Sequence, residues 1–181
     1  MVMCPKRFNI YLVLTLAAIL GFGCQTGEGK HKKQLSSLRF YLEVNSYSTN
    51  RTQTVAIPRV NPVKITVETE PFLTEANIKQ ASVVDALGGF ALRVEFERQG
   101  AWLLEEYSAA NRGKLVAIFS RFIDPVGKKL NEGRWIAAPR ISKRISDGVL
   151  IFTPDATREE AEQIAYGLTD IGKKLERDAK W

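Results

Sequence analysis

Few residues of this 181-residue chain could carry out catalytic chemistry. It has one histidine, His31, and two cysteines, Cys4 and Cys24. Because His31 lies in a polar segment, we expect it to be solvated, which leaves no base for a Ser-His-Asp or Cys-His set. No cluster has zinc-site spacing, and Gly88-Gly89 lacks the following Lys-Ser/Thr of a phosphate loop. The sequence therefore predicts no metal site and no cofactor.

Paired carboxylates are the remaining catalytic candidates. Glu95 and Glu97 share one face of an expected strand, and a hydrolase that used them would need a cleft that separates their pKa values. Nothing around them indicates such a cleft, so we interpret them as the solvated face of the strand. Glu105-Glu106 and Glu159-Glu160 are adjacent on expected helices and point apart. These patterns favour a protein that is not an enzyme.

Three tryptophans could line a binding groove. We expect Trp102 and Trp135 to lie in the core or at its rim, as large apolar side chains usually do. Trp181 is the last residue, where we expect fraying.

The N-terminus has the pattern of an export signal. Lys6 and Arg7 precede an apolar run over 10–20, which is too short to span a bilayer comfortably and is followed by Gly21-Phe22-Gly23-Cys24. The pattern resembles a bacterial lipoprotein signal, although Gly21 stands where Leu is usual. This resemblance implies removal of 1–23 and lipidation of Cys24, which would have no disulfide partner. An ordinary secretory signal or an uncleaved signal anchor is the alternative.

A polar basic tether is expected over 24–37. Its Lys30-His31-Lys32-Lys33 cluster would add affinity for an anionic membrane surface if Cys24 is acylated, and a merely soluble linker is the alternative. The net charge is +6, without a basic stripe interleaved with aromatic residues, so no nucleic-acid partner is expected. Because Gln25 rather than Asp follows Cys24, the outer membrane is favoured, with the domain facing the periplasm or exterior.

The domain begins with three strand patterns, over 38–44, 52–57 and 63–67. Together they predict an N-terminal β meander over 38–70 whose pairing order stays open. A second region, 71–176, is expected to pack with the meander as one unit. It opens with a short helix capped by Thr74 and an extended run over 81–86.

The stretch 91–119 predicts a β-α-β unit. Leu92, Val94 and Phe96 alternate with polar residues, which is typical of a half-buried strand. A helix is expected over 100–112, and Gly113 provides its stop. The apolar run 115–119 predicts a strand covered on both faces.

The last third of the chain predicts two strands and a long helix. The strands are expected over 134–138 and 149–153, joined by a connector over 141–145 whose isoleucines face the core and a turn at Asp147-Gly148. Thr157 and Glu160 form a capping box for the helix. The expected fold class is α+β: an antiparallel or mixed sheet with two main helices on one face.

The order of these motifs resembles the periplasmic head domain of the SecD subunit of the SecDF protein-export translocase. The similarity covers about residues 71 to 170 and departs from the family at Ser120-Arg121, where an Asp-Gly turn is usual. It includes Leu73-Thr74, the Asn-Arg-Gly-Lys that begins at 111, and the Thr-Arg-Glu-Glu-Ala that begins at 157. The positions that carry it are Asn111, Gly113, Lys114, Pro139, Gly148, Thr157 and Glu160.

This resemblance implies a SecD-head-like fold with ferredoxin-like elements and a surface that contacts emerging polypeptide. Family members continue into membrane helices that couple proton flow to movement. No run after Leu20 is long and apolar enough to span a bilayer, so a free-standing head domain on a lipid anchor is expected.

The resulting hypothesis is a non-catalytic, membrane-anchored envelope lipoprotein that binds polypeptide or a protein partner near the secretion machinery. An exposed sheet edge would accept an extended segment by strand addition. One alternative is a structural or assembly lipoprotein that docks a single protein partner. Another is an envelope hydrolase that uses Glu95 or Glu97. No small-molecule substrate is indicated.

Overall fold

The computed structural model describes residues 36–45, 51–57, 62–123 and 130–178, with side chains of the last helix described up to residue 169. These residues belong to one compact unit, 33–181. Cys24, the tether cluster that contains His31, and Trp181 lie outside the described residues. No helix among the described residues is long and apolar enough to cross a membrane.

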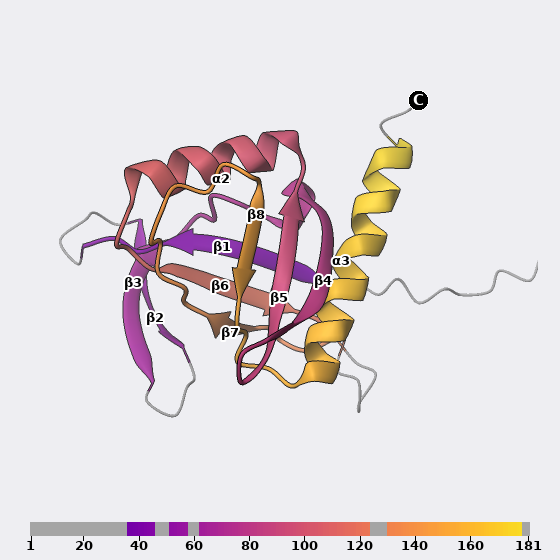
Figure 1. The fold of residues 1–181 in the computed structure, drawn as a ribbon. Helices are drawn as coiled ribbons and strands as arrows, with labels where there is room; N and C mark the ends of the chain where they lie inside the picture. Colours follow the sequence, from indigo (N-terminus) through magenta and orange to yellow (C-terminus); the bar gives the residue numbers. More distant parts are fainter. Residues whose placement is uncertain (1–35, 46–50, 58–61, 124–129, 179–181) are drawn as a thin grey trace, which may run out of the picture. The chain divides into compact units, whose positions relative to one another are not determined.

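The described strands form three antiparallel sheets (Figure 1). The middle sheet has the order β1-β6-β7, the outer sheet has the order β4-β5-β8, and β2 and β3 form a hairpin. In chain order the elements are β1 (Ser37–Leu42), β2 (Thr52–Ile57), β3 (Val63–Glu68), η1 (Glu75–Asn77), β4 (Ile78–Ala86), β5 (Gly89–Phe96), α2 (Arg98–Ala110), β6 (Val116–Arg121), β7 (Arg134–Ala137), β8 (Val149–Phe152) and α3 (Arg158–Asp178).

The middle sheet is buried on both faces. On one face, Phe40 and Ile118 lie in the main core, to which the outer sheet and both helices also contribute. The other face sends Tyr41 and Ala117 into a second cluster, which it shares with the β2-β3 hairpin. Trp135 lies at the rim of this cluster, 5.1 Å from the Tyr41 ring. The structure thus confirms that the apolar run at 115–119 is covered on both faces.

Both helices contribute to the main core, and α3 also covers a sheet edge. Leu104 of α2 and Ile164 of α3 are buried in the same cluster. Figure 1 shows α3 alongside β4. The Thr169 hydroxyl lies 3.2 Å from both the amide nitrogen and the carbonyl oxygen of Ala81, so it satisfies backbone groups on the outer edge of β4.

The helix termini follow the expected local rules. Glu160 N–H donates to Thr157 Oγ1 at 3.2 Å, and Thr157 N–H donates to a Glu160 carboxylate oxygen at 2.9 Å, which confirms the capping box. Gly113 has φ +87° just after α2, in the left-handed region that favours glycine. The short helix after Thr74 is a single 3₁₀ turn, η1.

The structure corrects two expectations about strand pairing. β5 and β6 lie in different sheets, so α2 links the outer sheet to the middle sheet and the stretch 91–119 is not a β-α-β unit of one sheet. β1 pairs with β6, with Phe40 opposite Ile118, so the expected meander reduces to the β2-β3 hairpin and an antiparallel bridge from Glu43, just after β1, to Val67 of β3. The α+β class, with antiparallel sheets and two main helices, is confirmed.

Candidate functional site

A cavity of about 390 Å³ lies between α2, the connector 139–147 and β8. We call it the β8 groove. Its volume falls within the range of small-ligand sites. Part of its wall is apolar and is formed by side chains at the edge of the core. Its charged side chains all belong to the connector. The apolar lining includes Phe72, Leu104, Tyr107, Val116, Ile145 and Leu150.

The connector and Gly148, which follows it, contact α2 at three points. The Ser108 hydroxyl accepts a hydrogen bond from Ile145 N–H at 2.9 Å and donates to the backbone of its own helix. Arg144 forms an ion pair with Glu105, one helical turn earlier. A Cβ added at Gly148 would lie 2.7 Å from the Cβ of Ala101, so the two backbones pack closely only because residue 148 is glycine. These contacts hold one wall of the groove in place.

The end of α2 holds the other end of the connector. Gly113 N–H donates to the carbonyl oxygen of Ile141 at 2.7 Å, and Ile141 N–H donates to the carbonyl of Lys114 at 2.9 Å. Asn111 caps the helix by donating its side-chain amide to Tyr107, and Lys114 Nζ donates to Asn111 Oδ1 at 2.9 Å. The helix stop and the connector are therefore one hydrogen-bonded unit.

The predicted motif positions fall into two groups. Asn111, Gly113 and Lys114 meet Pro139 at the end of the groove, where the Pro139 carbonyl accepts from the N–H of residue 116 at 2.9 Å. Gly148 lies at the start of β8 with φ +66°. Thr157 and Glu160 instead cap α3 and do not line the groove.

The outer edge of β8 borders the groove. Phe96 N–H donates to the Gly148 carbonyl at 3.0 Å, so Gly148 and every second residue after it direct their backbone groups toward β5. The backbone N–H and C=O groups of Val149 and Ile151 therefore point away from β5, toward the outer edge of the sheet. Val149 N–H donates to Asp147 Oδ1 at 3.1 Å, but no described residue pairs with the outward groups of Ile151. The Ile151 side chain is 55% exposed.

The other outer strands of the two three-stranded sheets are covered at specific points. Thr169 covers β4, as described above. Phe40 of β1 exchanges two backbone hydrogen bonds of 2.9 Å with the segment Phe72-Leu73. The Ile136 carbonyl of β7 accepts from Asp155 N–H at 2.6 Å. Of these four outer strands, β8 alone contributes residues to the lining of the β8 groove.

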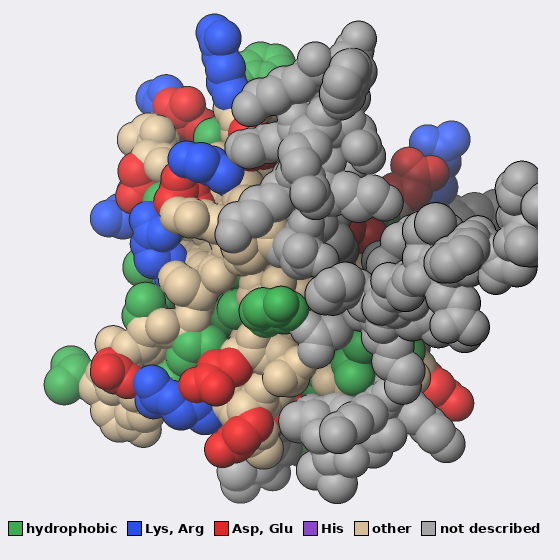
Figure 2. Space-filling model, turned by 90° about the vertical axis from the view of Figure 1, so that its right-hand side faces the viewer, with side chains coloured by type: hydrophobic (Ala, Val, Ile, Leu, Met, Phe, Trp, Pro, Cys, Tyr) green, Lys and Arg blue, Asp and Glu red, His purple; other side chains and the backbone are tan. Residues whose placement is uncertain are grey.

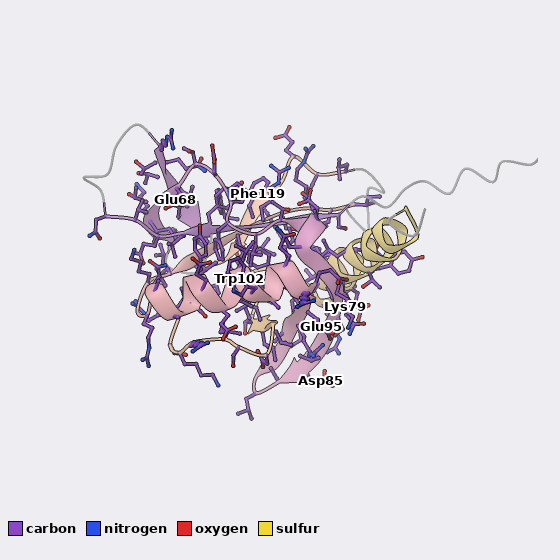
Figure 3. The ribbon with its side chains drawn as sticks, turned by 90° about the horizontal axis from the view of Figure 1, so that it is seen from above. Glu68, Lys79, Asp85, Glu95, Trp102 and Phe119 are labelled. Carbon is purple, nitrogen blue, oxygen red and sulfur yellow. The ribbon has the colours of Figure 1, made fainter. Side chains whose placement is uncertain are left out.

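Glu95, the first of the two strand carboxylates, lies elsewhere, on β5 beside β4. Glu95 accepts hydrogen bonds from Lys79 Nζ at 2.7 Å, Gln80 Nε2 at 2.8 Å and an Arg93 guanidinium nitrogen at 3.2 Å (Figure 3). These hydrogen bonds, of which the one from Lys79 has the largest effect, lower the pKa of Glu95 from 4.5 to about 2. A carboxyl with this pKa stays ionised near neutral pH and has no proton to donate as a general acid.

Both of these carboxylates, Glu95 and Glu97, are half-buried at the surface. The β8 groove is lined by neither Glu95 nor Glu97, and Glu97 is the N-cap residue of α2. Acidic and basic side chains are interspersed on the described surface in Figure 2, as in an ordinary solvated face. Among the described residues, no three His, Cys, Asp or Glu side chains are placed to hold a metal ion.

The prediction that Trp102 lies in the core or at its rim is wrong. Its side chain is 65% exposed on α2 (Figure 3). The helix buries Gly100, Leu104 and Ser108, which are spaced four apart, and residue 102 lies on the other side of this stripe. Sequence reasoning also missed the β8 groove, whose only local signal was the pair of inward isoleucines in the connector.

We predict that Gly148→Ala destabilises the domain more than Gly88→Ala. Both glycines have positive φ, +66° and +81°, which costs an alanine about 1 kcal/mol. Only the methyl group at 148 would also collide with Ala101, which adds about 1–3 kcal/mol. Denaturant unfolding measures both losses. Equal losses would show that the connector does not pack closely on α2.

We predict that Glu95→Gln lowers the free energy of unfolding at pH 7 by about 1 kcal/mol, since exposed ion pairs are screened by solvent. The pKa of Glu95 is depressed by folding, so its carboxylate stabilises the fold above pH 4.5, and this contribution is lost as the pH falls to about 2. Unfolding curves of both proteins should therefore converge over this range. A difference in unfolding free energy that does not shrink between pH 4.5 and pH 2 would contradict the assigned ion pairs.

Comparison with known proteins gives the same fold. A family model described as SecDF, P1 head subdomain, matches residues 50–170. A crystal structure of SecDF in a super-membrane-facing form has 23% identity and a TM-score of 0.52, and the match covers 76% of this chain and 19% of that one. A structure of SecDF, described as a membrane component that enhances protein export, has 22% identity and a TM-score of 0.50.

The second match covers 93% of this chain and 71% of that one. In the first match, by contrast, this chain spans only about a fifth of the SecDF chain. No curated protein matches it significantly. Because the family model spans well over half of the sequence, the chain belongs to the SecDF P1 head subdomain family.

Proposed function

We propose that this protein is a non-catalytic, membrane-anchored envelope lipoprotein whose head domain holds extended polypeptide near the secretion machinery. The observation that carries the proposal is the unpaired outer edge of β8 beside an apolar groove. Family membership supports the link to export, because a structurally similar SecDF is described as enhancing protein export.

The binding mode would be strand addition to β8. Ile151 offers an outward N–H and C=O, and Val149 offers a C=O, so a short extended segment would form backbone hydrogen bonds here. β8 spans Val149–Phe152, which limits the paired segment to about 13 Å at 3.3 Å per residue. Backbone pairing is common to all sequences, so such a site would accept many different chains.

The groove wall would hold alternate side chains of the bound segment. Phe72 and Tyr107 stack with ring centroids 4.5 Å apart and line the groove together with Leu150. Apolar contact with these rings would supply affinity that the few backbone bonds alone do not.

Two other functions from the sequence compete with this one. An assembly lipoprotein would use the same edge for one partner, and the range of captured chains would separate the two functions. An envelope hydrolase would need Glu95 in a cleft with an available proton. The ionised Glu95, held by ion pairs outside the β8 groove, favours the non-catalytic proposal.

The remaining parts of the proposal concern the N-terminus. Residues 1–23 would be removed as a signal, Cys24 would carry the lipid, and 24–37 would tether the domain to the outer membrane. Residues 38–70 and 71–176 would form one head facing the periplasm or exterior.

We predict that Ile151→Pro abolishes binding of an unfolded polypeptide while Ile151→Ala retains it. Proline removes an N–H that points away from β5, so the ladder of the outer sheet is kept and only strand addition is blocked. Fluorescence anisotropy with a labelled unfolded chain measures binding, and thermal unfolding checks both folds. Equal binding by both folded variants would contradict strand addition at β8.

We predict that mass spectrometry of the mature protein finds an N-terminal peptide that begins with diacylated or triacylated Cys24. Cys24→Ser should leave the signal uncleaved and remove the lipid mass. An unmodified Cys24, or an intact Met1, would refute the lipid anchor without affecting the groove.

A further inference from the structure

A group of cations gathers where the helix stop meets the connector. Among the described residues, none of them has a carboxylate within salt-bridge distance, whereas Arg144 nearby is paired with Glu105. We call this group the basic rim. Its members are Arg112, Lys114, Arg140 and Lys143.

Backbone contacts bring the rim residues together. The Arg140 guanidinium donates to the carbonyl of Gly113, between Arg112 and Lys114 in sequence. The carbonyl of Lys114 accepts from the N–H of Ile141 at 2.9 Å. Arg140 and Lys143 both line the β8 groove, so the rim extends from the helix stop into its wall.

Two nearby carboxylates, Glu43 and the groove-lining Asp147, accept backbone hydrogen bonds and form no described ion pair with the basic rim. Glu43 accepts from the N–H of Leu115 at 2.7 Å, and Asp147 accepts from that of Val149 at 3.1 Å. Cations near the C-terminus of α2 complement the helix dipole, which accounts for those at 112 and 114. Arg140 and Lys143 are not on the helix, so the dipole does not account for them.

We infer that the β8 groove selects extended segments in which an acidic residue accompanies apolar ones. This inference rests on the proposed function and names the chains that it favours. The carboxylate would approach Arg140 and Lys143 on the connector wall, while apolar side chains contact Tyr107 and Leu150. Charge complementarity of this kind mainly sets specificity and association rate.

Three labelled peptides test the preference on the full chain. They share one alternating, β-forming sequence and differ only at a central Glu, Gln or Lys. Anisotropy at low salt should rank affinities Glu over Gln over Lys, with steps of about threefold to tenfold, and the spread should shrink at high salt.

Lys143→Glu should reverse this order. Lys143 is exposed and has no described hydrogen bond, so the reversal should leave the fold intact. Lys64→Glu is the matched control: Lys64 is also exposed, but it lies on the β2-β3 hairpin and does not line the groove. This control should keep the wild-type ranking.

The outcomes distinguish failure of the acidic preference from failure of the proposed polypeptide binding. Equal binding of all three peptides, lost in Ile151→Pro, would overturn the acidic preference and leave the proposed function standing. No binding of any peptide would overturn both. Vesicles of anionic phospholipid form the last arm: if Lys143→Glu abolishes vesicle binding but leaves the peptide ranking unchanged, the rim binds membrane and the inference is wrong.

Discussion

Backbone N–H and C=O groups at strand edges must find partners, and the arrangement of this domain depends on how they do so. Two three-stranded sheets leave four outer strands. Thr169 covers β4, Leu73 contacts β1 and Asp155 contacts β7. β8 keeps outward groups at Ile151, beside a groove. Strand addition is therefore proposed for β8, where the outward groups of Ile151 have no described partner.

The groove is built from parts that hold one another rigidly. The helix stop at Gly113 fixes the start of the connector, Ser108 fixes its middle, and the contact of Gly148 with Ala101 fixes its end. Walls fixed in this way lose little conformational freedom on binding, which favours affinity. Of the family's motif positions, Asn111, Gly113, Lys114, Pro139 and Gly148 thus lie around the groove, whereas Thr157 and Glu160 cap α3.

Signals within a few residues could be interpreted from the sequence, whereas long-range pairing could not. The Thr157 capping box and the Gly113 stop each depend on neighbours less than one turn away. The pairing of Phe40 with Ile118 joins two strands that are far apart in the sequence. Several other strands have the same alternating or apolar pattern, so the pattern does not identify the partner. The groove could not be predicted for the same reason, because it depends on long-range packing. The burial of Trp102 was wrongly predicted because its size and hydrophobicity counted for more than its position on the helix, away from the buried stripe.

Native-state hydrogen exchange at β8 tests the central claim most directly. If the outer edge of β8 is unpaired, the Ile151 amide should exchange nearly as fast as a solvated amide, while the Leu150 amide, which faces β5, should be protected as part of the ladder. Protection of Ile151 equal to that of Leu150 would show that this edge is already covered, and would contradict strand addition at the groove.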